Sequence, residues 1–148
     1  MKTSVLIVSR HFPAGHPRAG QNTAFVEAVE RGMKVHTIRR SMRWQKIAEE
    51  VNAGQRVISL RYWTGKPYRS PQKEIKRLTS VSTQEVTMFN LTTGMEAFVE
   101  DAPVKIAHLA ANDGLSPEDF EAWFQPCFKG SNKFRGCIIF FNENNLYK

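Results

Sequence analysis

The sequence predicts one α+β domain built around a small β-barrel. Several short segments have the two-residue periodicity of strands, and a few helical patterns lie between them without the regular alternation of a doubly wound sheet. The length of 148 residues leaves little room for a second hydrophobic core. Hydrophobic residues make up 41% of the chain and charged residues 24%, which argues against a disordered or fibrous protein.

The first elements are a strand, a loop and a helix. Residues 4–9 form a β-branched apolar run between polar residues, which predicts a buried first strand. Residues 11–20 contain two prolines and two glycines, so a loop is expected. Asn22 is the predicted cap of a helix whose apolar face includes residues 25, 26 and 29, and Gly32 is placed to end it.

A second helix and a strand frame the next part of the chain. Apolar residues recur at helical spacing over 44–51, and Gly54 is placed to end that helix. The basic stretch 34–43 therefore lies between two predicted helices. From residue 56 the period changes to two, which predicts a half-buried strand as far as Tyr62.

The remainder of the chain is predicted to be mostly strand, interrupted by one helix. Residues 75–89 are rich in Val and Thr and predict one or two strands, and residues 94–99 predict another. Ser116 precedes proline and two acids, which is a typical helix start, and Pro126 is expected to stop this helix. The apolar run 134–141 predicts the last strand.

The charge of the chain favours a polyanionic partner. The chain has 21 lysine and arginine residues against 14 aspartate and glutamate residues, a net charge of +7. A surplus of this size attracts nucleic acid, although an ordinary basic protein without such a partner has the same composition. The only apolar run near the start, 5–8, is too short for a signal peptide or a membrane span, so we expect a cytoplasmic protein with no membrane partner. In that compartment Cys127 and Cys137 are expected to be free thiols that pack in the interior.

Three segments together resemble the ASCH family. They are Gly-Met-Lys-Val-His-Thr-Ile-Arg at 32–39, Gly-Gln-Arg-Val at 54–57 and Ala-Ala-Asn-Asp-Gly-Leu-Ser at 110–116. The resemblance covers most of the chain and implies that residues 1–148 form one ASCH domain with a PUA-like, mostly antiparallel β-barrel and flanking helices. Its implied functions range from association with RNA to hydrolysis of acylated cytidine.

The amidohydrolase branch of that family implies a catalytic role for Lys34, Thr37 and Asp113. In that branch the lysine is the base or activator, the threonine is the nucleophile, and a glutamate occupies the position of Asp113. Chemically, a threonine hydroxyl needs a neighbouring base, and a lysine can serve if burial or nearby cations lower its pKa. The Asp113-Gly114 pair also has an ordinary explanation as a turn before the next helix.

Two clusters are candidates for nucleic-acid or ligand contacts. The first comprises His36, Arg39 and Arg40, although charged runs of this kind are often simple solvent-facing turns. The second, across residues 61–70, alternates aromatic and basic side chains, as expected for base stacking beside phosphate anchors. Its predicted contacts are Trp63, Lys66, Tyr68 and Arg69. The alternative is that Tyr62 and Trp63 pack in the core while the cations remain in solvent.

These patterns lead to three hypotheses. The leading one is an RNA-binding or modified nucleoside-binding domain whose basic pocket lies between residues 34–40 and Asp113. The second is an amidohydrolase that uses the same pocket, and the third is an interaction module for an acidic protein. No cofactor or metal is expected, because the histidines have no ligand spacing with cysteines or acids and no phosphate-binding glycine loop or Gly-x-Ser-x-Gly elbow is present.

Overall fold

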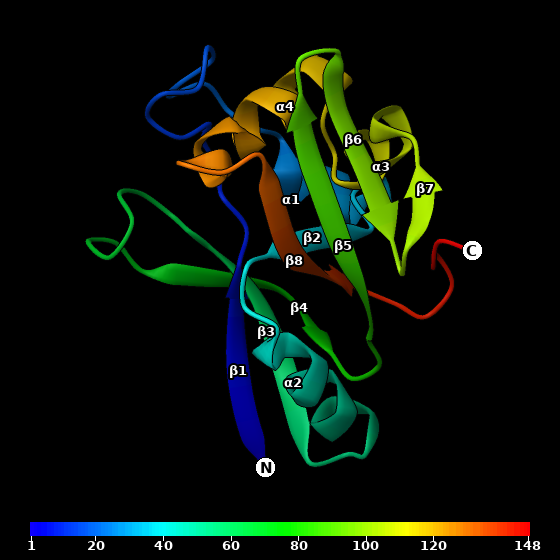
Figure 1. Ribbon diagram of the computed structural model, residues 1–148. Helices are drawn as coiled ribbons and strands as arrows, with labels where there is room; N and C mark the ends of the chain where they lie inside the picture. The colour runs from blue at the N-terminus through cyan, green and yellow to red at the C-terminus, as the bar shows by residue number, and fades with distance from the viewer.

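The chain folds into two β-sheets, with helices packed mainly on the larger one (Figure 1). The computed structural model describes residues 1–148. The strands are β1 (Lys2–Ile7), β2 (His36–Arg39), β3 (Arg56–Trp63), β4 (Gln72–Leu78), β5 (Ser82–Leu91), β6 (Gly94–Val99), β7 (Ala102–Val104) and β8 (Lys133–Phe140). The helices are α1 (Phe25–Glu30), α2 (Arg43–Asn52), α3 (Ile106–Asn112), α4 (Pro117–Phe124) and the 3₁₀ turn η1 (Gln125–Phe128).

The smaller sheet has the strand order β1-β3-β4 and lies with α2 in the lower part of Figure 1. Its central strand β3 pairs in parallel with β1 and antiparallel with β4. Ile58, Ser59 and Leu60 of β3 are fully buried, so both faces of the strand are covered at this point. The buried Ser59 hydroxyl is satisfied by donating to Glu74 on β4 and accepting from Arg61.

The larger sheet is antiparallel throughout, with the order β2-β8-β5-β6-β7. Strand β8, between β2 and β5, carries the apolar run Cys137–Phe140, which is completely buried. The short strand β2 pairs only with β8, with Thr37 opposite Ile139. This pairing fixes β2 at one edge of the sheet, beside the helices.

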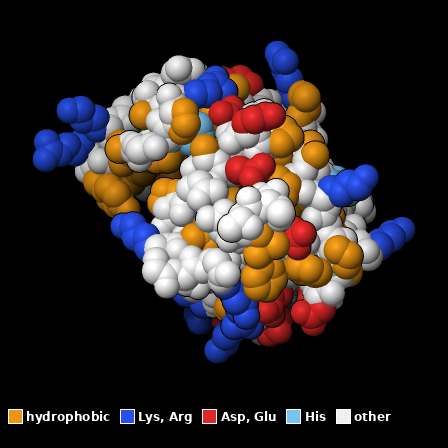
Figure 2. Space-filling view, turned by 45° about the horizontal axis from the view of Figure 1, so that its top comes forward, with side chains coloured by type: hydrophobic (Ala, Val, Ile, Leu, Met, Phe, Trp, Pro, Cys, Tyr) orange, Lys and Arg blue, Asp and Glu red, His pale blue; other side chains and the backbone are white.

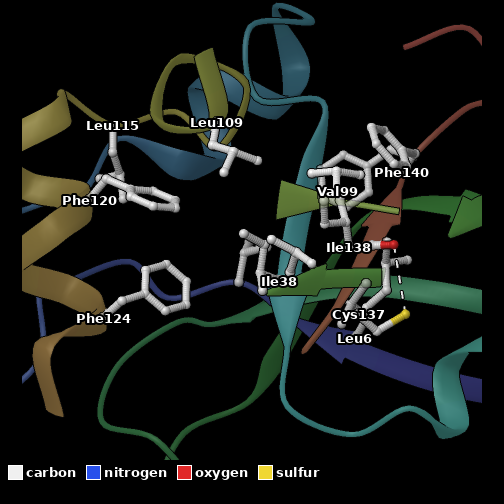
Figure 3. Close-up of a cluster of buried hydrophobic side chains, with 14 of the residues drawn as sticks. Leu6, Ile38, Val99, Leu109, Leu115, Phe120, Phe124, Cys137, Ile138 and Phe140 are labelled. Carbon is white, nitrogen blue, oxygen red and sulfur yellow. Dashed lines mark hydrogen bonds between the residues drawn. The ribbon is translucent and has the colours of Figure 1, made fainter. Parts of the chain in front are cut away.

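Helices α3 and α4 pack against the larger sheet close to its edge strand β2. Figure 3 shows Phe120 and Phe124 of α4 pointing toward Ile38 of β2, with Leu109 of α3 above them. The α4 helix begins as predicted, because the Ser116 side chain accepts a hydrogen bond from the Asp119 N–H at 3.1 Å. These apolar contacts hold β2 and α4 on opposite sides of one hollow.

The α+β class predicted from sequence is confirmed, but the sheets do not close into a barrel. Closure would need backbone pairing between an edge of each sheet. The Arg39 side chain instead donates to the Ile7 carbonyl and so bridges β1 and β2. β1 and β2 form no backbone ladder with each other, so these two sheet edges remain open.

Three details of the sequence prediction are wrong. The first strand is not buried, since β1 is an edge strand with Val5 exposed. Asn22 is not the helix cap. That position is taken by Ala24 in a left-handed conformation (φ 63°), and the Asn22 side chain accepts from the Ala24 N–H at 2.8 Å. The elements β2, β7, α3 and η1 were not predicted.

Most other predicted elements are present. Gly32 and Gly54 follow α1 and α2 with positive φ angles, as predicted for helix ends. The region 75–89 divides into β4 and β5, and the last apolar run is β8. Cys127 and Cys137 are free, and Cys137 is fully buried. No helix of this structure is both long enough and apolar enough to cross a membrane.

Candidate functional site

A pocket of about 360 Å³ opens between β2, the end of β1 and the α4–η1 segment. It lies at the hollow that the Phe124 and Ile38 side chains border in Figure 3. Its polar lining consists of Ser9, Lys34, Thr37, Arg39, Arg40 and Asp113. Its aromatic lining consists of Phe25, Trp123, Phe124 and Phe134. The pocket thus combines fixed charges with flat apolar walls, at a size typical of small-ligand sites.

Lys34 and Asp113 form a buried ion pair at the base of this pocket. The Lys34 ammonium donates to Asp113 Oδ1 at 3.0 Å and to the Asp113 carbonyl at 2.7 Å. It also lies 4.1 Å from the centre of the Phe25 ring. Burial lowers the pKa of Lys34; Asp113 opposes this shift, and the nearby Arg39 adds to it.

Asp113 is held in place by the end of α3. It is the C-cap residue that directly follows that helix, and Gly114 comes next with φ 82°. A side chain at Gly114 would approach Lys34 Cβ at 3.3 Å, so glycine allows the lysine to lie against this turn. Burial alone would raise the pKa of Asp113, but the Lys34 ammonium and the adjacent His36 side chain lower it below its ordinary value.

His36 lies behind Asp113, away from the pocket. Its side chain is fully buried, and Nδ1 is 3.4 Å from Asp113 Oδ1, a charge contact that lacks the geometry of a good hydrogen bond. On the other side, Nε2 is hydrogen-bonded to the Tyr147 hydroxyl at 2.7 Å. The sequence prediction placed His36 against the ligand, whereas the structure places it in a supporting layer.

Tyr147 anchors the C-terminal segment to this layer. Its hydroxyl accepts from the Asn112 amide at 2.9 Å, and its backbone N–H and carbonyl are both bonded to the Gln84 side chain. Burial raises the pKa of Tyr147, so the hydroxyl keeps its proton and can donate it to His36 Nε2. With Nε2 as the acceptor, the ring proton of His36 is assigned to Nδ1, which faces Asp113.

Thr37 and Arg39 project from the same side of β2. Residues two apart on a strand share a face, and the Arg39 guanidinium donates to Thr37 Oγ1 at 2.5 Å. The same guanidinium donates to the Ile38 and Ile7 carbonyls, and burial lowers its pKa. Lys34 directs its hydrogen bonds to Asp113, so it makes none to the Thr37 hydroxyl.

Arg40 is the most accessible cation of the pocket. Arg40 is exposed, and its guanidinium lies 5.1 Å from the centre of the Phe134 ring, which lines the pocket. The alternative of a solvent-facing basic turn therefore holds for Arg40 and fails for the buried Lys34, His36 and Thr37.

The second predicted cluster lies at the tip of the β3–β4 hairpin, which projects to the left in Figure 1. The Trp63 and Tyr68 rings are 5.1 Å apart at an angle of 47°. They line a second hollow of about 400 Å³, which shares Ile7 and Ser9 with the first pocket. The sequence left open whether Tyr62 and Trp63 pack in the core. Tyr62 does pack against the core, whereas Trp63 lines this hollow.

The two clusters thus meet on one side of the molecule, although they are separated in sequence. In Figure 2 hydrophobic side chains gather in a hollow at the left, with lysine and arginine side chains at its outer margin. Lys66 and Arg69 are exposed at the hairpin tip. No group of three or more His, Cys, Asp or Glu side chains is arranged to hold a metal ion.

Several residues of the site were not predicted from the sequence. Trp123 and Phe124 were identified only as the apolar face of a helix, and nothing in their spacing indicated that they wall a pocket. Ser9 belonged to the predicted first strand. Tyr147 lies after the last strand in a segment with no helical or strand periodicity. Its supporting role is evident only from its hydrogen bond with His36.

Comparison with known proteins gives no relative: no family model, no curated protein and no solved structure matches the chain. The function is therefore argued from the chemistry of the pocket.

Proposed function

We propose that the pocket between β2, Asp113 and α4 binds a nucleotide unit of single-stranded RNA or a modified nucleoside, and that the chain is an ASCH-type domain. The observation that carries this proposal is the buried Lys34–Asp113 pair beside aromatic walls and the exposed Arg40. Two of the segments that resemble the ASCH family, 32–39 and 110–116, both contribute to the pocket, which supports a PUA-like relationship despite the open sheets.

Asp113 provides a feature for recognising a base. Its Oδ1 atom is engaged by Lys34, Oδ2 accepts no hydrogen bond from the protein, and the residue lines the pocket. A carboxylate oxygen of this kind accepts from an exocyclic amine, as on cytosine N4. Uracil lacks that amine, so we expect a preference for a base that carries an amino group.

The aromatic lining of the pocket and the exposed Arg40 provide further contacts for a nucleotide. Trp123 and the phenylalanines of the lining offer aromatic faces, on which unpaired bases stack. Arg40 at the opening can contact a phosphate, and the net charge of +7 favours the approach of a polyanion. Such a role fits the cytoplasmic location expected from the sequence.

The proposal is tested by titrating a fluorescent single-stranded hexacytidine at several salt concentrations. We expect log K to fall linearly with log salt, with a slope of about 0.7 per phosphate contacted. Arg40→Ala should weaken binding and reduce the slope by about that amount, whereas Arg31→Ala, an exposed arginine outside the pocket, should do neither. Absent or salt-independent binding would count against an RNA ligand.

A second candidate function is hydrolysis of an acylated cytidine in the same pocket. It is favoured by the position of Thr37, whose oxygen accepts from Arg39 and would be stabilised as it loses its proton. Thr37 Oγ would attack the acyl carbon, the amide C–N bond would break, and the cytidine amine would leave with a proton. Water would then hydrolyse the threonine ester to a free acid.

Lys34 is the candidate proton carrier in that reaction, because burial lowers its pKa. The test is to incubate the protein with 4-acetylcytidine and follow cytidine by chromatography. Thr37→Ala should abolish release and Thr37→Ser should retain part of it, with both variants folded. Full release by Thr37→Ala would remove the nucleophile role, and no release by the unmodified protein would leave the binding function alone.

A further inference from the structure

We propose that the hollow at the β3–β4 hairpin tip is a second nucleotide subsite, so that the ligand is single-stranded RNA of at least two nucleotides. This inference rests on the proposed function of the first pocket and adds the class of ligand. The first observation is geometric: the two hollows share the lining residues Ile7 and Ser9, so they are adjacent and one short strand can reach both.

The second hollow has an open aromatic face. Tyr68 is 89% exposed, although burial of such a ring is normally favourable. Its backbone has φ 64°, a conformation unfavourable for a bulky residue. The adjacent Trp63 ring is tilted by 47°, so it does not cover the Tyr68 face as a parallel stack would. The hairpin therefore exposes an aromatic ring on a residue whose backbone conformation is strained. A turn with only a structural role could carry glycine at this position without that strain.

The turn that presents Tyr68 is ordered by its own hydrogen bonds. The Ser70 hydroxyl donates to the Lys66 carbonyl and accepts from the Gly65 N–H, each at 2.9 Å. The Arg69 N–H also donates to the Lys66 carbonyl at 3.1 Å. Because the turn is fixed before binding, little conformational entropy is lost when a base stacks on the ring.

The charge around the hollow matches a phosphate chain. Lys66 and Arg69 flank Tyr68 and form no salt bridge, and the hairpin segment 64–70 contains no acidic residue. Arg10 lines the hollow with one nitrogen bound to the Thr64 carbonyl. Cations on both sides of exposed aromatic rings are the arrangement of proteins that bind single strands by stacking. An acidic peptide would use the cations but not the rings.

The test compares cytidine 5′-monophosphate with the dinucleotide CpC, using calorimetry on the full chain. CpC should bind more tightly than the monophosphate. Tyr68→Ala should weaken CpC binding about 5- to 150-fold, the range expected for one stacked base, and leave the monophosphate unaffected. Tyr68→Phe retains the ring and should bind CpC as the unmodified protein does. Because Tyr68 is exposed, all variants should keep the same melting temperature.

The outcomes separate the second subsite from the first. Equal affinity of the two probes, or CpC binding unchanged in Tyr68→Ala, overturns the second subsite; the proposed function then still stands if Arg40→Ala weakens binding of the monophosphate. Failure of both probes to bind overturns the second subsite and the nucleotide pocket together.

Discussion

The Lys34 ammonium lies 3.0 Å from the Asp113 carboxylate, and the two residues are only 2% and 5% exposed. They are 79 positions apart in the sequence, so this contact joins the start of β2 to the end of α3. Charges removed from water in this way are costly unless each has a partner. The pair therefore links the stability of the fold to the chemistry of the pocket.

The two members of the pair should be energetically coupled, so their losses on substitution should not add. Lys34→Met leaves the Asp113 charge without its partner and should lower the free energy of unfolding by about 3–5 kcal/mol. The double variant Lys34→Met/Asp113→Asn should lose less than the sum of the two single losses. Urea denaturation measures all four proteins, and strictly additive losses would show that the two side chains are not coupled.

Acid should destabilise the protein through Asp113. Its pKa in the folded state is lowered, so the unfolded state binds more protons as the pH falls through about 4. This contribution is complete above the unfolded pKa and is lost as the pH falls through the folded one. Melting temperatures between pH 6 and pH 2.5 measure the loss.

The Asp113→Asn variant is the reference for that titration. Glu50 and Glu85 also have lowered pKa values because each pairs with an arginine, so both proteins share this background. The melting curve of the variant should be flatter in acid. An equal acid dependence in the two proteins would mean that Asp113 does not contribute.

The Tyr147 hydroxyl should contribute measurably to stability. Tyr147→Phe leaves His36 Nε2 and the Asn112 amide without their partner, which should cost about 1–3 kcal/mol. Tyr68→Phe removes a hydroxyl at an exposed position and should cost almost nothing. Nitrogen NMR of the His36 ring should also show a changed tautomer balance in Tyr147→Phe. An unchanged His36 spectrum would argue against the assigned proton on Nδ1.

Gly136 should tolerate no side chain. A Cβ atom there would lie 2.7 Å from the Phe134 ring and 2.9 Å from the Arg39 carbonyl, which β2 holds in place. Gly136→Ala should therefore lower stability by about 1–3 kcal/mol. Gly65→Ala, where the new atom meets only the Ser70 side chain, should lose less. Equal losses, measured by thermal unfolding, would show that the strand can shift without cost.

The sequence was sufficient to predict elements whose signals are local. Ser116 followed by proline and acids marked the start of α4, and two-residue periodicity located β3. The class and most strands followed from such patterns. The prediction of Asn22 as the helix cap was wrong, although its side chain does accept a backbone hydrogen bond from Ala24. The helix begins only at Phe25, and Ala24 is its cap residue.

The tertiary features depended on contacts that no local pattern encodes. Whether two sheets close into a barrel depends on pairing between distant edge strands, and here β1 and β2 are joined by the Arg39 side chain without a ladder. The burial of His36 depends on Tyr147, 111 positions away. Lys34, Thr37 and Asp113 were found because residue chemistry and the family resemblance selected them, whereas Trp123 became visible only when α4 was placed against β2.

The central claim is that the β2 pocket binds a nucleotide unit. The most direct test is to titrate ¹⁵N-labelled protein with cytidine 5′-monophosphate and map the amide shifts. Our account predicts saturable shifts at Thr37, Arg39, Asp113 and Trp123, which line the pocket. Shifts confined to another surface, such as the hollow beside Gln45 and Asn52, or no shifts at millimolar ligand, would contradict it.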